Sequence, residues 1–391
     1  MVGSMVNSIF KAPIDLRKHT SLIYAEGVFG LGARKKFPMR AKTADGILRY
    51  ANYKIAGVVD LEAYTPLSLL RRGEGGEVKA GDILPAYLTG SKNFNAPIFQ
   101  SIREAKGVTN ADVLIIGSAP EGGDLPDDYK NDIAWAIKNK MHIVSGTHYA
   151  LNEDSKFLKL SKKYKTILWD ARKFSHTEDV DKIPVGSLQV YHIKKPIVLT
   201  VGMDAAIGKM TVGYEMHKAA QALGARSIVI PTGQTTIMIE GWGAAIDALP
   251  ADFMAGAVEK MLLDVQNTAD VFFVEGQGSL FHPAYANTCI SLIHGAVPSH
   301  IVLVHRPQRK HSIGSKLVKL PDVKSAIRYY ENSVLPSYRN TKVIGVALNT
   351  DGLSSRDAEA SKKEMSKQCG LPVFDALRDK DAVTKIVKSI L

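Results

Sequence analysis

Short apolar runs rich in β-branched residues alternate along the whole chain with amphipathic segments. A bounded apolar run predicts a buried strand, and apolar positions three or four apart predict a helix. Strands are expected at residues 21–24, 55–60, 112–117, 141–145, 166–170, 197–201, 227–231, 271–274, 301–305, 343–348 and 372–374. Helices are expected between them, at residues 42–50, 98–106, 129–138, 157–163, 255–265, 356–369 and 379–390. This alternation predicts an α/β protein with parallel sheets and ligands at the carboxyl ends of the strands.

The pattern is interrupted between residues 173 and 195, a segment that contains Pro184 and Gly186 and lacks clear periodicity. A chain of 391 residues is also long for one core, since single cores rarely grow beyond about 250–300 residues. We therefore expect a Rossmann-like domain over residues 1–190, with a substrate or interface role. A second α/β domain is expected over residues 191–391.

Residues 197–211 predict a phosphate-binding loop, or P-loop, because a strand, a loop of small residues and an amphipathic helix follow one another. In such loops backbone N–H groups surround the phosphate oxygens, and a lysine reaches the β- and γ-phosphates. The residues expected to contact a nucleotide are Gly202, Ala205, Ala206, Gly208, Lys209, Met210 and Thr211. The alternative is a plain Rossmann turn with Lys209 in solvent.

Two features depart from the usual P-loop pattern. Five residues, and not four, separate Gly202 from Gly208. Met210 stands where a hydroxyl normally binds Mg²⁺, and the hydroxyl comes one residue later, on Thr211. The pattern favours phosphate binding and leaves the metal geometry open.

Glu275 directly follows the apolar strand 271–274 and is followed by Gly276. A carboxylate at such a strand end, in one domain with a P-loop, organises Mg²⁺ in nucleotide-dependent enzymes. We therefore expect Thr211 and Glu275 to hold the metal; the alternative is an incidental acid. Other polar residues at or after strand ends are candidates for ligand contacts, namely Thr235, Gln277, Ser279, His282 and Asn349. Of these, Asn349 stands where P-loop enzymes often recognise the base with an amide, and the basic loop 306–311 either covers phosphates or is solvated.

Charge and composition limit the kinds of partner that we expect this protein to bind. The chain has 50 Lys plus Arg against 39 Asp plus Glu, a net charge of +11, but basic and acidic residues are mostly interleaved. Without a long basic run or a nucleic-acid motif, we expect no nucleic acid as partner, and instead a small anionic substrate. Cys289 and Cys369 lie far apart, and no segment resembles a signal peptide or a membrane span, so we expect a cytoplasmic protein without membrane contact. We also expect a homo-oligomer.

With these residues in place, the chain resembles a two-domain family long catalogued as a domain of unknown function. The resemblance is carried by residues 25–27, 42–50, 118–123, 145–148, 208–211, 232–235, 247, 251–253, 275–279 and 348–350. Residues 202–204 and 275–276 are also similar to dethiobiotin synthetase, an ATP-dependent enzyme. That likeness implies a P-loop NTPase-type second domain, with phosphate and metal roles for Lys209 and Glu275 and a base-recognising role for Asn349.

The family contains two branches with different chemistry. One resembles D-glutamate N-acetyltransferase, which uses acetyl-coenzyme A, and the other resembles archaeal mevalonate-3-phosphate 5-kinase. Thr236 stands where the acetyltransferase pattern commonly has glycine, and residues 305–309 carry an insertion in its usual His-Pro-Gly-Arg stretch. These departures and the basic first domain favour the kinase, with the acetyltransferase as the alternative.

The kinase hypothesis predicts transfer of the γ-phosphoryl group of ATP, with Mg²⁺, to the 5-hydroxyl of mevalonate 3-phosphate. Lys209 would hold the phosphates, and Asp204 would orient the hydroxyl. Residues expected to contact the acceptor are Lys42, Arg49, Thr235, Gln277, Ser279 and His282. A protein that binds nucleotide without turnover is a third possibility.

Overall fold

The computed structural model describes residues 6, 8–26, 42–60, 96–118, 125–173, 181–334 and 338–391. The chain forms two compact units that each draw on more than one segment. One unit consists of Lys11–Thr177 and Gln234–Trp242, and the other of Met1–Phe10, Glu178–Gly233 and Gly243–Leu391. Of the sequence motifs named above, Gly27 and residues 119–123 lie outside the described residues. Within the described part of the chain, no helix is both long and apolar enough to span a membrane.

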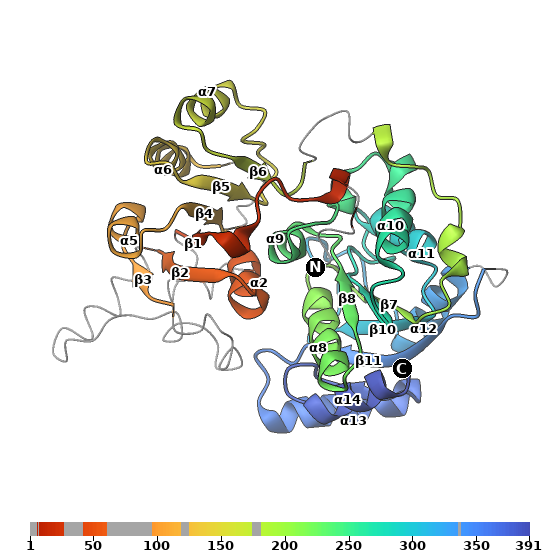
Figure 1. The fold of residues 1–391 in the computed structure, drawn as a ribbon. Coiled ribbons are helices and arrows are strands. Elements are labelled where there is room, and N and C mark those ends of the chain that lie inside the picture. The colour runs from red at the N-terminus through yellow and green to blue at the C-terminus, as the bar shows by residue number, and fades with distance from the viewer. Residues whose placement is uncertain are drawn as a thin grey trace. The chain divides into compact units, whose positions relative to one another are not determined.

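The unit that begins at Lys11 is built on a six-stranded parallel sheet with strand order β3-β2-β1-β4-β5-β6. Its strands are β1 (Thr20–Tyr24), β2 (Lys54–Val59), β3 (Ile98–Phe99), β4 (Val113–Ile116), β5 (His142–Ser145) and β6 (Leu168–Asp170). Its helices are α2 (Lys42–Tyr50), α5 (Ile102–Thr109), α6 (Asp127–Lys138), α7 (Ser155–Tyr164) and α9 (Gln234–Glu240). Figure 1 shows α2 on one side of this sheet and α5, α6 and α7 on the other, as right-handed crossovers require.

Helix α9 is the late segment of this unit, since it is separated from the rest by more than fifty residues of the chain. It packs against α2, and the Thr235 hydroxyl donates to the Thr43 hydroxyl over 3.3 Å. At its first residue, Gln234 accepts from the Arg172 guanidinium and lies against Gly146, just beyond β5. Helix α9 therefore contributes side chains at the carboxyl edge of this sheet.

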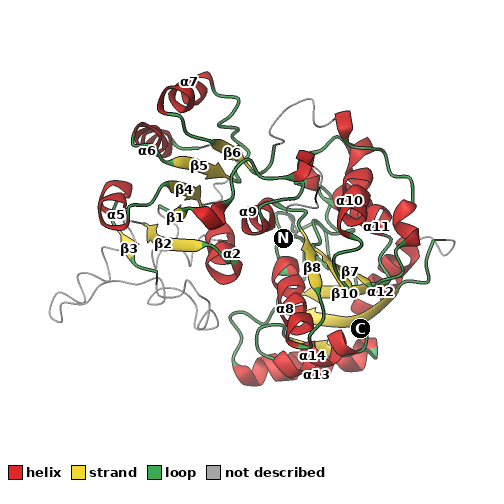
Figure 2. Ribbon diagram, in the orientation of Figure 1, coloured by secondary structure: helices red, strands yellow, loops and turns green. Residues whose placement is uncertain are grey.

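The other unit also has a six-stranded parallel sheet, with strand order β12-β11-β10-β7-β9-β8. Its strands are β7 (Ile197–Gly202), β8 (Ser227–Ile230), β9 (Val271–Val274), β10 (His300–His305), β11 (Lys342–Leu348) and β12 (Val373–Phe374). Its helices are α8 (Lys209–Ala222), α10 (Ala251–Val265), α11 (Ala286–Ala296), α12 (Val323–Ser333), α13 (Ser355–Cys369) and α14 (Lys380–Lys388). Helices α8 and α14 pack together, as do α10 and α11 (Figures 1 and 2). Strand β7 is buried along its whole length between β9 and β10.

The α/β class and the parallel sheets predicted from the sequence are confirmed. Two local predictions are wrong. Residues 98 and 99 form β3, and the helix predicted from residue 98 begins only at Ile102, where the Ser101 side chain caps it. Thr235, which we expected in a polar stretch after a strand, lies instead in α9, which begins at Gln234. This helix forms because the following residues, Ile237 to Ile239, are apolar and buried.

The segment that leads into β7 is held by a buried carboxylate. Glu259 of α10 is 3% exposed and accepts hydrogen bonds from the backbone N–H groups of Ser187, Leu188 and Gln189, and from the Ser187 hydroxyl. Gly256, one turn earlier, permits this contact, because a Cβ there would lie 1.7 Å from the carbonyl oxygen of Pro184. The carboxylate thus substitutes for the hydrogen bonds that an irregular segment cannot make with itself.

We expect Glu259→Ala to destabilise the protein by about 2–3 kcal/mol, because several buried donors lose their acceptor together. Urea unfolding followed by circular dichroism measures the change. Glu259→Gln, which keeps the shape and one acceptor oxygen, should lose clearly less. Equal losses for the two variants would show that packing, and not the carboxylate, holds the segment.

Candidate functional site

The loop between β7 and α8 is shaped by two residues with positive φ. Ala206 has φ +54° and Gly208 has φ +106°, and α8 begins immediately afterwards at Lys209. Ala206 is strained there, since residues with a Cβ rarely adopt this region. A backbone that reverses its curvature twice before a helix N-terminus turns successive N–H groups toward one point, which is the geometry of an anion-binding loop.

Lys209 points back into this loop. Its side chain is 6% exposed, and its Nζ donates to the carbonyl oxygen of Asp204 over 2.9 Å. Burial, with a smaller contribution from nearby Arg309, lowers the pKa of Lys209 to about 8, although Cys289, Asp204 and Glu275 oppose the shift. The ammonium group is therefore poorly solvated and poorly neutralised, so a bound anion would stabilise it.

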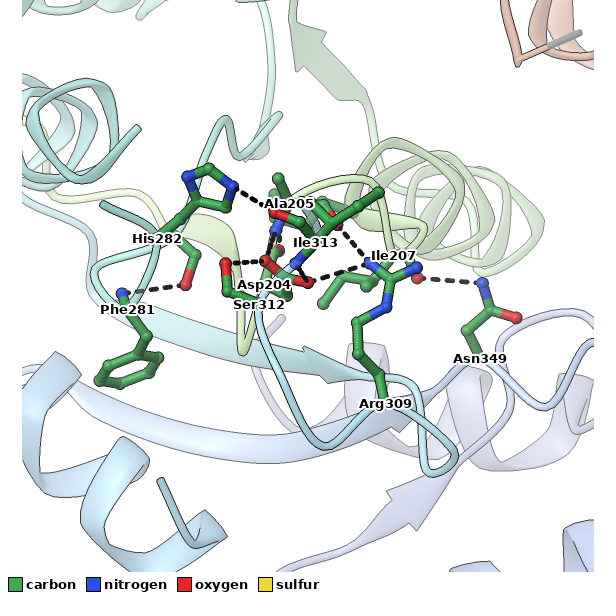
Figure 3. Close-up of polar contacts among 11 residues, drawn as sticks. Asp204, Ala205, Ile207, Phe281, His282, Arg309, Ser312, Ile313 and Asn349 are labelled. Atoms are coloured by element: carbon green, nitrogen blue, oxygen red, sulfur yellow. Dashed lines mark hydrogen bonds and ion pairs between the residues drawn. The ribbon is translucent and has the colours of Figure 1, made fainter. Parts of the chain in front are cut away.

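The carboxylate of Asp204 is fully buried and accepts four hydrogen bonds (Figure 3). Oδ1 accepts from the backbone N–H of Ala205 and from the Ser312 hydroxyl. Oδ2 accepts from the Arg309 guanidinium at 3.0 Å and from the N–H of Ile313 at 2.8 Å. Asp204 thus joins the P-loop to the basic loop that follows β10.

The Glu275 carboxylate lies just beyond β9 and receives two backbone donors. Its Oε2 accepts from the N–H groups of Thr232 and Gly233, at 3.2 and 2.9 Å. The Thr232 hydroxyl donates to the backbone carbonyl of Glu275, and the Gln277 amide donates to that hydroxyl over 3.4 Å. The loops after β8 and β9 are thereby joined next to the P-loop.

Gly276 is required by a close approach of two backbones. Its N–H donates to the Thr200 hydroxyl over 3.0 Å, and a Cβ at Gly276 would lie 1.6 Å from the carbonyl oxygen of Thr200. Thr200 sits in the middle of β7 and is fully buried. Our sequence reasoning missed Thr200, although a buried hydroxyl in an otherwise apolar strand is the signal that could have shown it.

Tyr330 of α12 is a second residue that sequence reasoning missed. Its buried hydroxyl donates to the carbonyl oxygen of Gly202 over 2.6 Å and accepts from the N–H of Leu280. The thiol of Cys289 lies 3.8 Å from the same hydroxyl, and burial raises its pKa to about 11. The Tyr330 hydroxyl thus holds the backbone at Gly202, the Cys289 thiol lies against that hydroxyl, and the thiol stays protonated.

His282 and Ser279 support the same loops. The Nδ1 of His282 accepts from the N–H of Ala284, so its Nε2 carries the proton and donates to the carbonyl oxygen of Ile313. Ser279 is fully buried, and its hydroxyl accepts from the N–H of Phe281. Both side chains are therefore used in holding the backbone.

Asn349 lies beyond β11, and its amide contacts the P-loop. Its Nδ2 donates to the carbonyl oxygen of Ile207 over 3.1 Å (Figure 3). Its Oδ1 accepts from the N–H of Asp351. The P-loop unit also contains the expected nucleotide contacts Gly202, Ala205, Ala206, Gly208, Met210 and Thr211.

The remaining candidates belong to the other unit. Lys42 and Arg49 lie at the two ends of α2, and Thr235 lies on α9, which packs against α2. For the metal, the structure places Thr211 in the first turn of α8 and Glu275 beyond β9. Across the described residues, no group of three or more His, Cys, Asp or Glu side chains is placed to hold a metal ion.

Comparison with known proteins decides the family. A family model described as a domain of unknown function, DUF1611, with a P-loop domain matches residues 182–387, and its Rossmann-like partner model matches residues 79–174. The chain belongs to the DUF1611 family. It is 33% identical over 270 residues to D-glutamate N-acetyltransferase of a Pseudoalteromonas species, covering 69% of this chain and 79% of the relative.

Two further relatives extend the comparison. D-glutamate N-acetyltransferase of Tritonibacter scottomollicae is 32% identical over 284 residues, covering 71% of this chain and 81% of the relative. The crystal structure of a DUF1611 family protein from Anabaena variabilis superposes with a TM-score of 0.81 at 32% identity, covering 95% of this chain and 99% of that one. The two-unit architecture therefore occurs in another DUF1611 protein.

These relatives correct our functional prediction. The expected mevalonate-3-phosphate 5-kinase is wrong, because the two relatives at 33% and 32% identity whose names give an activity are acetyltransferases and not phosphotransferases. The P-loop did not distinguish a kinase from an acetyltransferase, since it can bind phosphates that are transferred and also phosphates that only anchor a coenzyme.

Proposed function

We propose that the protein is an acetyl-coenzyme A-dependent N-acetyltransferase whose acceptor is D-glutamate or a similar acidic D-amino acid. The observation that carries the proposal is the 33% identity to D-glutamate N-acetyltransferase over 270 residues, which cover 69% of this chain and 79% of the relative. In this reaction the acceptor nitrogen attacks the thioester carbonyl, the C–S bond breaks, and the coenzyme leaves as a thiol that takes up a proton from the amine.

The P-loop would hold the pyrophosphate of coenzyme A. The backbone N–H groups of residues 206–209 and the buried ammonium of Lys209 supply the positive charge that a pyrophosphate needs. The coenzyme's pyrophosphate is not cleaved, so no γ-phosphoryl group and no ATP are consumed. We therefore expect Mg²⁺ to be dispensable, with Thr211 and Glu275 supporting the loop.

The length of the coenzyme places the chemistry away from the P-loop. The pantetheine arm between pyrophosphate and thioester is about as long as four extended residues, roughly 14 Å. Asp204 and Glu275, which bond directly to the P-loop and the adjoining loops, would thus act at the phosphate end of the coenzyme and not on the acetyl group.

An acidic acceptor brings two carboxylates, which need cationic partners. Lys42 and Arg49 on α2 are the cations that we assign to them, with Thr235 of α9 as a polar contact. Gln277, Ser279 and His282 remain with the P-loop unit, where they hold the loops after β9 and β10.

The test is a spectrophotometric assay of free coenzyme A thiol with the purified protein, acetyl-coenzyme A and D-glutamate. We expect thiol release that depends on the amino acid and persists with a chelator, with N-acetylglutamate identified by mass spectrometry. L-Glutamate and D-alanine are the matched controls for configuration and for the second carboxylate.

Two results would contradict the proposal. Thiol release that is unchanged without an amino acid would show simple thioester hydrolysis. Absence of product with any acidic amino acid, while coenzyme A binds, would leave only a coenzyme-binding protein.

A further inference from the structure

The loop after β10 carries an arginine whose bonding is incomplete. Arg309 uses one guanidinium nitrogen, Nη1, for its contacts with the Asp204 carboxylate and the Ala205 carbonyl oxygen, both at 3.0 Å. Among the described residues, its Nη2 and Nε make no hydrogen bond, and the side chain is only 18% exposed. Three of its five N–H donors are thus held beside the P-loop and available to a ligand.

Two cations meet at Asp204. Lys209 is bonded to its backbone carbonyl and Arg309 to its carboxylate, so both positive groups lie against the same turn of the P-loop. Figure 3 shows Arg309 extending from its loop toward Asp204 and Ala205. Burial lowers the pKa of Lys209, and the positive charge of Arg309 contributes to this shift in the same direction.

The arginine is held in place from several sides. Asp204 also accepts from Ser312 and Ile313, three and four residues beyond Arg309. The carbonyl oxygen of Ile313 accepts from His282. Both the N–H and the carbonyl group of Ile313 are therefore held by hydrogen bonds. Backbone hydrogen bonds from Leu320 to Lys310 and from Ser312 to Val318 then close the loop into a short hairpin.

We propose that Arg309 is a second phosphate ligand of the P-loop, which contacts the pyrophosphate of coenzyme A, and that Asp204 is the residue that positions it. This inference rests on the proposed function only for the choice of ligand. A pyrophosphate beside Lys209 accepts from the Nη2 and Nε donors of Arg309 while Nη1 stays on Asp204. A planar fork with several donors suits a bridging diphosphate better than a lysine would.

The role that this gives Asp204 explains a feature that otherwise opposes phosphate binding. A buried carboxylate at a P-loop repels an anion, and it occupies the N–H group of Ala205. The positive charge of Arg309 neutralises the Asp204 carboxylate, and the carboxylate in turn holds the arginine in a fixed orientation beside the P-loop. Asp204 is in this sense a positioning residue.

The experiment compares two ligands that contain the pyrophosphate with pantetheine, which lacks the pyrophosphate and the adenosine attached to it. Calorimetric titration gives the affinities of the wild-type protein and Arg309→Ala for coenzyme A, 3′-dephospho-coenzyme A and pantetheine. We expect Arg309→Ala to weaken both phosphorylated ligands at least tenfold and to leave pantetheine unchanged. Arg306→Ala is the matched control, because Arg306 is in the same loop but donates to the carbonyl oxygen of Asp351.

A double-mutant cycle tests the positioning role. In an Asp204→Asn background, Arg309→Ala should weaken coenzyme A by less than threefold. The same loss in both backgrounds would show that Asp204 does not position Arg309. If Arg309→Ala is unstable, Arg309→Lys takes its place in the titrations. This variant keeps the charge and loses the planar fork, so it should bind coenzyme A more weakly than the wild-type protein.

The outcomes separate the two proposals. Wild-type protein that prefers coenzyme A over pantetheine, with Arg309→Ala unchanged, overturns the role of Arg309 alone. Wild-type protein that shows no such preference removes the phosphate site altogether. Binding that follows the expected pattern without any acetyl transfer supports Arg309 and overturns the proposed function.

Discussion

Lys209→Ala is expected to weaken coenzyme A binding about 10- to 100-fold. A hydrogen bond to a charged group is worth about 1.5–3 kcal/mol, and the buried Lys209 ammonium gives the P-loop its central positive charge. Pantetheine, which has no phosphates, should bind the variant and the wild-type protein equally well. Calorimetry with both ligands measures the difference.

The variant should not lose stability, because burial already disfavours the charged form of Lys209 and lowers its pKa to about 8. A thermal melt therefore separates a binding defect from a folding defect. Lys218→Ala on the same helix is the matched control, since Lys218 is half exposed and pairs with Glu215. Unchanged coenzyme A affinity in Lys209→Ala would remove the P-loop from the site.

The same pKa gives the wild-type protein a pH dependence. Below pH 8 Lys209 is protonated and attracts the pyrophosphate; above it, the free protein loses this charge and must take up a proton to recover the contact. Affinity for coenzyme A should therefore fall as the pH rises from 7 to 9, by at most about tenfold per pH unit, while that for pantetheine stays level.

Gly276→Ala is expected to destabilise the P-loop unit by about 3 kcal/mol or more. The new Cβ would lie 1.6 Å from the Thr200 carbonyl oxygen, and neither backbone can yield without breaking the pairing of β7. The Gly276 N–H would also leave the Thr200 hydroxyl, to which it donates. Chemical unfolding of the purified variant measures the loss, and weak soluble expression would accompany it.

Gly213→Ala provides the matched control. Its Cβ would lie 3.9 Å from the Thr200 methyl group, an ordinary contact, within α8. Alanine is favoured over glycine in a helix by about 0.5–1 kcal/mol, so this variant should be at least as stable as the wild-type protein. Equal stability of the two variants would show that the backbone contact at Thr200 is not required.

The sequence predicts the two sheets and the P-loop because their signals are local. A β-branched run followed by small residues and an amphipathic segment places Gly208 and Lys209 at the start of α8 without reference to the rest of the chain. The same holds for Glu275, which the apolar strand β9 carries to the carboxyl edge of the sheet. The order of strands, loops and helices along the chain is therefore enough to predict which loops meet at the carboxyl edge of the sheet.

The contacts that set the chemistry are not local. Arg309 reaches Asp204 across 105 positions of the chain, and Tyr330 reaches Gly202 across 128, so no spacing rule relates them. Thr236, which favoured the kinase in our sequence reasoning, is fully buried in α9. A difference from glycine at a packed helix position reflects packing and carries no information about the transferred group.

The route of the chain sets the order in which the protein can fold during synthesis. The unit that begins at Lys11 is complete only with Gln234–Trp242, whereas the other unit has already begun by then with β7, α8 and β8. Strands β7 and β8 and helix α8 of the other unit are therefore synthesised before α9, the segment that completes the unit beginning at Lys11. Neither unit can mature as a simple N-terminal or C-terminal half, and each depends on a stretch made while the other is unfinished.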